Sequence, residues 1–234
     1  MGFFRLILGI IPARGGSKGL PGKNIKEFCG KPLIAHTIDC ARKSKELKEF
    51  IVSTDSIEIA EVAQDYGAEV PFLRPPELAT DYARAIDNYI YTFKRLENEF
   101  GRTYRAACVL QPTSPLRTPE DIDKALEIFT LHDADSVVSV SPLIHPPSWA
   151  KKIEGDGKIK NYFPNDGKQM NRQDEIEGYA PNGAIFILKR KLLEETLSYY
   201  SEKSFAYLMP KERSLDIDDL FDFKFAELIW KARV

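Results

Sequence analysis

The chain has few cysteines, almost no excess of charge and no apolar run long enough to span a membrane. Its three cysteines, Cys29, Cys40 and Cys108, are irregularly spaced and form no Cys-x-x-Cys pair. This excludes a disulfide framework or a cysteine-rich zinc site and favours thiols in a reducing compartment. The 33 lysines and arginines nearly balance the 35 aspartates and glutamates. That balance excludes a protein dedicated to nucleic acid or anionic membranes, because both partners require a cationic surplus.

The chain also lacks the signature of an exported protein. Its N-terminal apolar run is brief and continues into Pro-Ala-Arg-Gly-Gly without a small-residue cleavage pattern, so we expect a cytoplasmic protein. Hydrophobic residues make up 43% of the 234 positions, which excludes disorder. A chain of this length buries roughly 70–75% of its unfolded surface. With no internal repeat and no low-complexity linker, we expect one domain over residues 1–234.

Apolar runs alternate with segments of helical spacing along most of the chain. The predicted strands cover residues 6–11, 50–54, 69–73, 106–110, 136–140 and 184–188. The predicted helices follow Pro32 and cover residues 56–66, 83–100, 119–131 and 220–230. Such alternation is typical of right-handed βαβ crossovers and predicts an α/β fold with a mostly parallel sheet. Residues 142–178 break the rhythm with turn-forming Pro, Gly and Asn-Asp-Gly sequences, which predict an excursion of hairpins and loops.

The loop after the first predicted strand combines cations with glycines. Arg14, Lys18 and Lys23 lie within ten residues, together with four glycines and Ser17. Ligands of open parallel sheets bind beyond the carboxyl ends of the strands, where this loop lies. Oriented backbone N–H groups and three cations suit a triphosphate. The loop is neither a Walker A motif nor G-x-G-x-x-G, and an ordinary glycine-rich connection remains the alternative.

A second polar cluster follows the predicted strand at residues 106–110. It lies in the sequence Leu-Gln-Pro-Thr-Ser-Pro-Leu-Arg at residues 110–117. Two prolines stiffen the turn, and Gln111, Thr113 and Ser114 can present polar groups to a hydroxylated ligand. The alternative is a turn that caps the helix beginning at Pro119, which explains Thr118 but not the other polar residues.

An acidic pair lies near the C-terminus, in Leu-Asp-Ile-Asp at residues 215–218. In an extended segment Asp216 and Asp218 lie on one face, about 7 Å apart. Two carboxylates together with substrate phosphate oxygens suit Mg²⁺. The alternative is that Asp218 or Asp219 simply caps the final helix.

Other polar residues leave two interpretations open. Arg74, before Pro75-Pro76, either hydrogen-bonds a base or covers the sheet edge. Asp55 is either a ligand or a helix N-cap, and Arg172 either contacts phosphate or faces solvent. The three histidines show no spacing that indicates a metal site or a catalytic pair.

Taken together and in chain order, six segments closely resemble the acylneuraminate cytidylyltransferases (CMP-sialic acid synthetases). They are IPARGGSKGLPGKNI at 11–25, VSTD at 52–55, RPPELA at 74–79, LQPTSPLR at 110–117, PNGA at 181–184 and LDID at 215–218. They cover nearly the whole chain, and the first and last are the most specific. The related CMP-Kdo synthetases have Tyr-Ala-Ser-Thr-Arg where this chain has Gly-Gly-Ser-Lys-Gly, so they match less well.

The resemblance implies a Rossmann-like three-layer α/β/α nucleotidyltransferase fold with a small β-rich insertion. It further implies a homodimer that exchanges the excursion at about 142–178, and Mg²⁺-dependent transfer of CMP from CTP to a nine-carbon 2-keto sugar acid with release of pyrophosphate. Arg14, Lys23 and Asp218 would be catalytic. By the same resemblance, the CTP phosphates and ribose would be bound by Arg14, Ser17, Lys23 and Asn24, and cytosine by Ala13, Arg74 and Ala83. The sugar acid would be bound by Gln111, Thr113, Ser114, Arg172 and Asn182. The metal would be held by Asp216 and Asp218.

The chain departs from the family pattern mainly on the sugar side. Ala180 and Trp149 replace an Arg and a Lys of some members, and Ala85 replaces a Ser near the base. Because a sugar carboxylate needs a charged or multiply donating partner, a legionaminic, pseudaminic or deaminated sialic acid is an alternative acceptor. A pyrophosphorylase for another nucleotide and a non-catalytic nucleotide-binding module are the alternative functions. The sequence leaves the general base, the number of metals and the kinetic order open.

Overall fold

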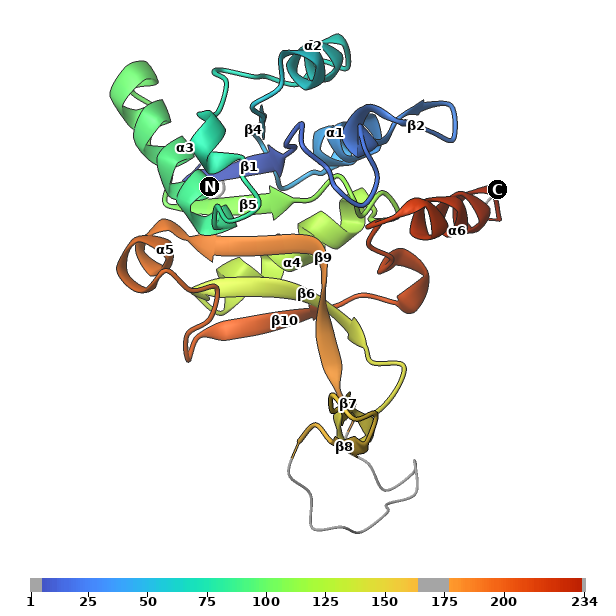
Figure 1. The fold of residues 1–234 in the computed structure, drawn as a ribbon. Helices are drawn as coiled ribbons and strands as arrows, with labels where there is room; N and C mark the ends of the chain where they lie inside the picture. Colours follow the sequence, from blue (N-terminus) through green and yellow to red (C-terminus); the bar gives the residue numbers. More distant parts are fainter. Residues whose placement is uncertain (1–5, 164–176, 233–234) are drawn as a thin grey trace.

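A six-stranded sheet runs through the centre of the molecule in the order β10-β6-β9-β5-β1-β4 (Figure 1). The computed structural model describes residues 6–163 and 177–232. β1 pairs in parallel with β4 and β5, and β10 pairs in parallel with β6, whereas β9 is antiparallel to both β5 and β6. The predicted, mostly parallel sheet is therefore confirmed. The strands are β1 (Ile7–Pro12), β4 (Phe50–Ser53), β5 (Ala106–Leu110), β6 (Ser136–Pro142), β9 (Tyr179–Lys189) and β10 (Ser204–Leu208).

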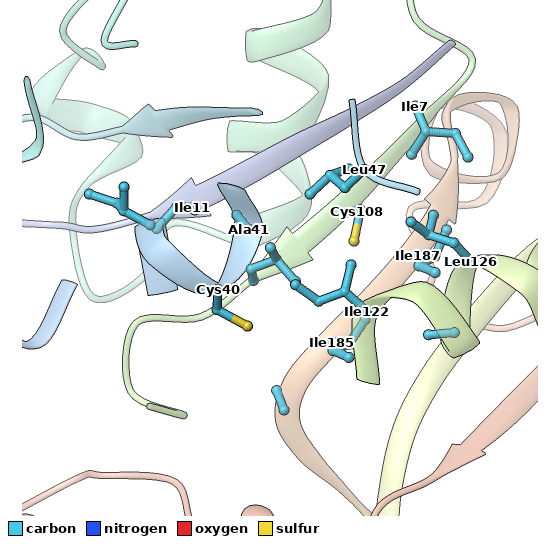
Figure 2. Close-up of a cluster of buried hydrophobic side chains, with 14 of the residues drawn as sticks. Ile7, Ile11, Cys40, Ala41, Leu47, Cys108, Ile122, Leu126, Ile185 and Ile187 are labelled. Atoms are coloured by element: carbon cyan, nitrogen blue, oxygen red, sulfur yellow. The ribbon is translucent and has the colours of Figure 1, made fainter. Parts of the chain in front are cut away.

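Helices cover both faces of the sheet because alternate strand residues point to opposite faces. Ile7 and Ile11 of β1 pack in one core cluster with α1 (Leu33–Lys43), α2 (Ile57–Asp65) and α4 (Pro119–Leu131) (Figure 2). Leu8 and Ile10 pack in a second cluster with α3 (Ala85–Phe100) and α5 (Arg190–Thr196). Two helical layers around one sheet confirm the predicted three-layer architecture.

The last helix, α6 (Leu220–Lys231), packs away from the sheet. Its Phe223 and Ala226 form a third cluster with Leu20 and Phe28, and Ile217 lies in the same cluster, fully buried. Leu20 precedes η2 (Lys23–Ile25), and Phe28 belongs to the small hairpin of β2 (Glu27–Phe28) and β3 (Lys31–Pro32). The cluster thus joins the cationic loop to the acidic segment near the C-terminus, about 200 residues away in the sequence.

Local capping explains where several helices begin. Thr118 and Asp121 form a reciprocal capping box at the start of α4, and Asp219 and Asp222 form one at the start of α6. The N-cap of α2 is Ser56, so the interpretation of Asp55 as the cap was wrong. Asp219 is the cap of α6, which leaves the carboxylate of Asp218 unused for capping.

Residues 69–73 do not form the predicted strand. Only two isolated parallel bridges join this segment to the β4 region, Ile51 to Glu69 and Thr54 to Leu73. Pro71 interrupts the ladder because it has no N–H to donate. Among the helices and the strands of the central sheet, α5 and β10 were not predicted. β9 also begins earlier than expected, since its first residues pair with the end of β6 beyond a register shift between Val138 and Val140.

The described part of the excursion contains η4 (Pro147–Trp149) and a hairpin of β7 (Lys151–Ile153) and β8 (Ile159–Asn161). It projects from the ends of β6 and β9, away from the central sheet (Figure 1). The remaining short helical turns are η3 (Pro76–Leu78) and η5 (Lys211–Arg213). Among the described residues, no helix combines the length and apolar character that a membrane crossing requires.

Candidate functional site

A pocket of about 530 Å³ opens at the carboxyl ends of β1, β4 and β5, where ligands of open α/β sheets bind. Its walls come from the cationic loop, from the segment that follows Arg74, from the turn after β5 and from the acidic segment before α6. Most of the predicted site residues line this one pocket: Arg14, Ser17, Lys23, Asn24, Arg74, Ala83, Gln111, Thr113 and Asp218. Four sequence segments predicted separately therefore meet at one place.

At one wall of the pocket, the carboxylate of Asp81 lies between two cations. Asp81 is 3.0 Å from Arg14 Nη1 and 2.6 Å from Lys18 Nζ. The hydrogen bond from Lys18 lowers the pKa of Asp81, so this carboxylate is ionised at neutral pH. All three side chains are partly exposed. Asp81 therefore occupies the position in which an anionic ligand would meet these cations, and such a ligand would have to displace it.

Lys23 joins the cationic loop to the acidic segment. Its ammonium donates a hydrogen bond to the carbonyl of Ile217 and lies 3.8 Å from Asp218 Oδ1. Gly19 completes the junction, because a Cβ at this position would lie 2.3 Å from the carbonyl oxygen of Asp218. Only glycine permits so close an approach. Asn24 is buried and its amide donates to the carbonyl of Arg14 at 3.0 Å, which fixes the loop conformation.

Hydrogen-bond donors line the back of the pocket. Arg74 is 7% exposed, and Asp55 Oδ1 lies 3.5 Å from its Nη2. Burial lowers the pKa of Arg74, and Asp55 opposes this shift. Asn88 is 1% exposed and accepts a hydrogen bond from Ser53 Oγ at 3.0 Å through its Oδ1. Within the described chain, Arg74 Nε and Asn88 Nδ2 have no hydrogen-bond partner, so this wall can receive a ligand that carries acceptor atoms.

The two acidic residues near the C-terminus have different environments. Asp218 is exposed, whereas burial raises the pKa of Asp216 and a hydrogen bond with Thr113 opposes the shift. Asp216 Oδ1 is buried, and no described residue provides it with a hydrogen-bond partner. A Cβ at Gly183 would lie 3.0 Å from Asp216 Oδ2 and 3.3 Å from Gln111 Oε1. The acidic pair therefore lies beside the turn after β5.

Residues 6–163 and 177–232 contain no group of three or more His, Cys, Asp or Glu side chains placed to hold a metal by themselves. Two carboxylates nevertheless fit Mg²⁺, which commonly binds one or two protein carboxylates together with substrate phosphates and water. The unpartnered oxygen of Asp216 is the observation that supports this fit.

Four predicted residues in the described part of the chain do not line the pocket: Ala13, Ser114, Asn182 and Asp216. Ala13 and Ser114 are fully buried. Asn182 is 7% exposed, and its side-chain amide is used within the protein. Asn182 Oδ1 accepts from Ser139 Oγ at 2.6 Å and from the backbone N–H of Ala184, and Asn182 Nδ2 donates to Ser214 Oγ at 2.9 Å. Arg172 lies outside the described residues.

The sequence interpretation missed Asp81 and Asn88. A signal for Asn88 was available, because Asn88 and Thr92 put polar groups on the buried side of α3 next to Tyr89 and Phe93. Buried polar residues on an otherwise apolar helix face commonly have a specific hydrogen-bonding role. For Asp81 we find no comparable signal, since its role depends on the position of Arg14 in space.

Comparison with known proteins gives a consistent result. A family model described as cytidylyltransferase matches residues 8–228. The chain is 42% identical over 226 residues to the CMP-N,N'-diacetyllegionaminic acid synthase of Legionella pneumophila, covering 94% of each chain. It is 32% identical to the pseudaminic acid cytidylyltransferase of Campylobacter jejuni, covering 95% of each. It is 39% identical to the N-acylneuraminate cytidylyltransferase of Escherichia coli O18:K1:H7 but spans only 52% of that protein.

Solved structures share the fold at low sequence identity. The CMP:2-keto-3-deoxy-manno-octonic acid synthetase complexed with CTP aligns with a TM-score of 0.73 and 16% identity, over 97% of this chain and 99% of the other. The 4-diphosphocytidyl-2C-methyl-D-erythritol synthase of Anaerococcus prevotii aligns with a TM-score of 0.66 and 16% identity, over 97% of each. These likenesses support the predicted nucleotidyltransferase fold.

Proposed function

Because this chain belongs to the cytidylyltransferase family, we propose that it transfers CMP from CTP to the anomeric hydroxyl of a nonulosonic sugar acid, releasing pyrophosphate. The observation that carries the proposal is one pocket that combines three cations, a donor-rich back wall and the carboxylate of Asp218, with Asp216 two residues away in the sequence. Relatives named for legionaminic, pseudaminic and N-acylneuraminic acids support the acceptor class.

The cationic loop would bind the triphosphate. Arg14, Lys18 and Lys23 line the pocket, and CTP would displace Asp81 from the first two. As the anomeric oxygen bonds to the α-phosphorus, the bond to the bridging oxygen breaks and negative charge accumulates on pyrophosphate. Cations already positioned in the pocket stabilise that charge. Ser17 and Asn24 border the same loop and would contact the phosphates and ribose.

The back wall would select cytosine. Cytosine presents two adjacent acceptors, O2 and N3, whereas uracil carries a proton on N3. Arg74 and Asn88 offer only unpartnered N–H donors at this wall. Two donors facing O2 and N3 would therefore favour cytosine, with backbone groups near Ala83 available to the amino group.

Asp216 and Asp218 would hold Mg²⁺. When bound, the ion would polarise the α-phosphate and neutralise part of the nucleotide charge. Lys23, through its contact with Ile217 O and Asp218, keeps the acidic segment against the cationic loop. Gln111, beside Asp216, would orient the sugar acid so that its hydroxyl lies close to the α-phosphate.

We further propose that two copies associate through the excursion at 142–178. Its described residues expose large apolar side chains, among them Ile144 at 72%, Ile153 at 76% and Ile159 at 67%. A projecting hairpin with such a surface is typical of an association site. Light scattering coupled to gel filtration should give a mass near twice 26.6 kDa, and a concentration-independent monomer would refute this proposal.

The decisive experiment supplies CTP, Mg²⁺ and one sugar acid at a time and measures pyrophosphate release. The panel contains N-acetylneuraminic, diacetyllegionaminic, pseudaminic and deaminated sialic acids. We expect turnover with CTP and at least one of them, and little with UTP or GTP. Preference for another nucleotide, or CTP binding without turnover on every acid, would refute the proposed function.

A further inference from the structure

A second cavity of about 250 Å³ lies between α1, the start of α4 and the end of α6. Its lining includes Lys31, His36, Lys43, Arg117 and Trp230. Among the described residues it shares no lining residue with the nucleotide pocket. The reaction proposed above uses none of these side chains.

Arg117 is a buried cation with only neutral partners. It is 4% exposed, and its guanidinium donates to the carbonyls of Ala184 at 2.6 Å and Gln111 at 3.3 Å and to Thr37 Oγ1 at 2.9 Å. Within residues 6–163 and 177–232, no carboxylate lies at ion-pair distance from it and its Nε has no hydrogen-bond partner. A buried charge without a counter-ion is unfavourable, so an anion in the adjoining cavity would stabilise this group.

His36 is a buried acceptor in the same lining. It is 4% exposed, and its Nε2 is 2.7 Å from the carbonyl of Phe28. This places the proton on Nε2 and leaves Nδ1 as an acceptor, for which no described residue supplies a donor. Burial lowers the pKa of His36, so the ring is neutral near pH 7. Edge contacts with Phe28 and Trp230, at centroid distances of 5.1 and 4.5 Å, hold the ring in place.

The charges around the cavity favour an anion. Lys31 is paired with Asp39, whereas Lys43 is exposed and has no ion pair with any described residue. The lining therefore holds three cations, Lys31, Lys43 and Arg117, against one carboxylate, Asp39.

We propose that this cavity is a binding site for a small phosphate anion. Hydrogen phosphate matches both unpartnered groups, because its charged oxygens accept from Arg117 Nε and Lys43 while its P–OH donates to His36 Nδ1. Sulfate has the same shape and charge but no proton to donate at pH 7, so it satisfies only the cations. The cavity has about half the volume of the nucleotide pocket, which favours orthophosphate or pyrophosphate over a nucleotide.

The test is a titration at pH 7 that follows the imidazole NMR signal of His36. The chain has only three histidines, and the His36→Gln variant assigns the signal. We expect orthophosphate to shift it saturably and sulfate to bind about tenfold more weakly, as the loss of one hydrogen bond predicts. Pyrophosphate, titrated separately, shows which of the two phosphate anions the cavity prefers.

Variants separate this site from the nucleotide pocket. Lys43→Ala should weaken phosphate binding several-fold, whereas Lys124→Ala, another exposed lysine on a neighbouring helix, should not. Arg14→Ala, in the nucleotide pocket, should leave the His36 titration unchanged. The proposal is overturned if phosphate does not shift the His36 signal, if sulfate binds as tightly as phosphate, or if Arg14→Ala abolishes the shift.

Discussion

The nucleotide pocket and a hydrogen-bonded polar network outside it differ in how their polar side chains are satisfied. In the pocket, Arg74 Nε and Asn88 Nδ2 are buried and lack partners among the described residues, and so does Asp216 Oδ1 beside it. Outside the pocket lies a set of residues that we call the inner wall: Asp121, Ser139, Asn182, Tyr207, Arg213 and Ser214. Here the polar groups bond to one another, as in the contacts of Asn182 with Ser139 and Ser214.

This difference indicates which polar residues serve ligand binding and which stabilise the fold. Buried polar groups that lack a protein partner destabilise the fold and are available to a ligand, whereas a fully satisfied network stabilises the fold. Changes in the pocket should therefore reduce activity without lowering stability, and changes in the inner wall should reduce stability first.

The largest effect expected is on turnover, from Asp218→Ala. The Asp218 side chain is 85% exposed and caps no helix, so the thermal midpoint should be unchanged. Loss of a carboxylate proposed to hold Mg²⁺ should lower kcat by about a thousandfold or more. Pyrophosphate release and thermal unfolding should be measured together.

The neighbouring aspartate provides the matched control for that change. Asp219→Asn also removes a charge but retains the N-cap, since asparagine caps helices as well as aspartate does, and it should remain active. Near-normal turnover of Asp218→Ala at saturating Mg²⁺ would remove Asp218 from the mechanism.

The next largest effect is on stability, from Asp121→Ala in the inner wall. Asp121 is 1% exposed and accepts two hydrogen bonds from Arg213, at 2.8 and 3.0 Å, and one from Tyr207 at 2.8 Å. Removing it leaves a partly buried guanidinium unpaired and should reduce the free energy of unfolding by about 3 kcal/mol. Glu127→Ala, on the exposed face of α4, is the control. An unchanged denaturant midpoint would contradict the assignment of this network to stability.

The ion pair between Asp121 and Arg213 also predicts how the free energy of unfolding changes at acid pH. Burial opposes ionisation of Asp121, but hydrogen bonds from Arg213, Thr118 and Tyr207 outweigh it and hold the pKa below the ordinary 3.8. Because the pKa of Asp121 is lower in the folded state, its stabilising effect is fully present at pH values above the pKa of the unfolded state. The effect is lost as the pH falls through the pKa of the folded state. The difference in unfolding free energy between wild type and Asp121→Ala should therefore be constant near neutral pH and shrink below about pH 4.

The sequence alone predicted all but one strand of the central sheet, and most helices, because their signals are local. The core strands are continuous apolar runs, and α3 and α4 are long amphipathic helices with clear ends. The errors have local causes too. The run at 69–73 looked like a strand despite Pro71, and α5 has only seven residues, too few to show a helical period.

The candidate site was predictable where residues of one kind lie together in the sequence. The cationic loop and the acidic pair are of this kind, and the loop cations and Asp218 line the pocket. Which polar side chains are buried in the folded protein cannot be predicted from such clusters in the sequence. Ser114 and Asn182 resemble ligand-binding residues in the sequence, yet they lie behind the wall. Asp81 pairs with Arg14 only because the folded chain brings these two residues together.

A smaller effect, on nucleotide choice, is expected from Asn88→Asp. Ser53 Oγ can still donate to the carboxylate, so the change replaces only the N–H donor proposed to face the base by an acceptor. The ratio of kcat/KM for CTP to that for UTP should fall about tenfold, the value of one hydrogen bond. Thr92→Val, which removes a bond to the Asn88 carbonyl, should leave the ratio unchanged. An unaltered ratio in Asn88→Asp would show that this amide does not contact the base.

The smallest effect expected is a gain, from Asp81→Asn. Asp81 neutralises Arg14 and Lys18 in the unliganded pocket, so CTP must compete with it. Removing the charge while retaining the side-chain shape should lower KM for CTP by about two- to fivefold, since exposed ion pairs are weak. The gain should shrink at high salt, which screens these charges. Asp87→Asn, which breaks the exposed pair with Arg84 outside the pocket, should not alter KM. A higher KM in Asp81→Asn would mean that Asp81 helps to bind the nucleotide. Asp81 would then position Arg14 and Lys18 for CTP instead of competing with CTP for them.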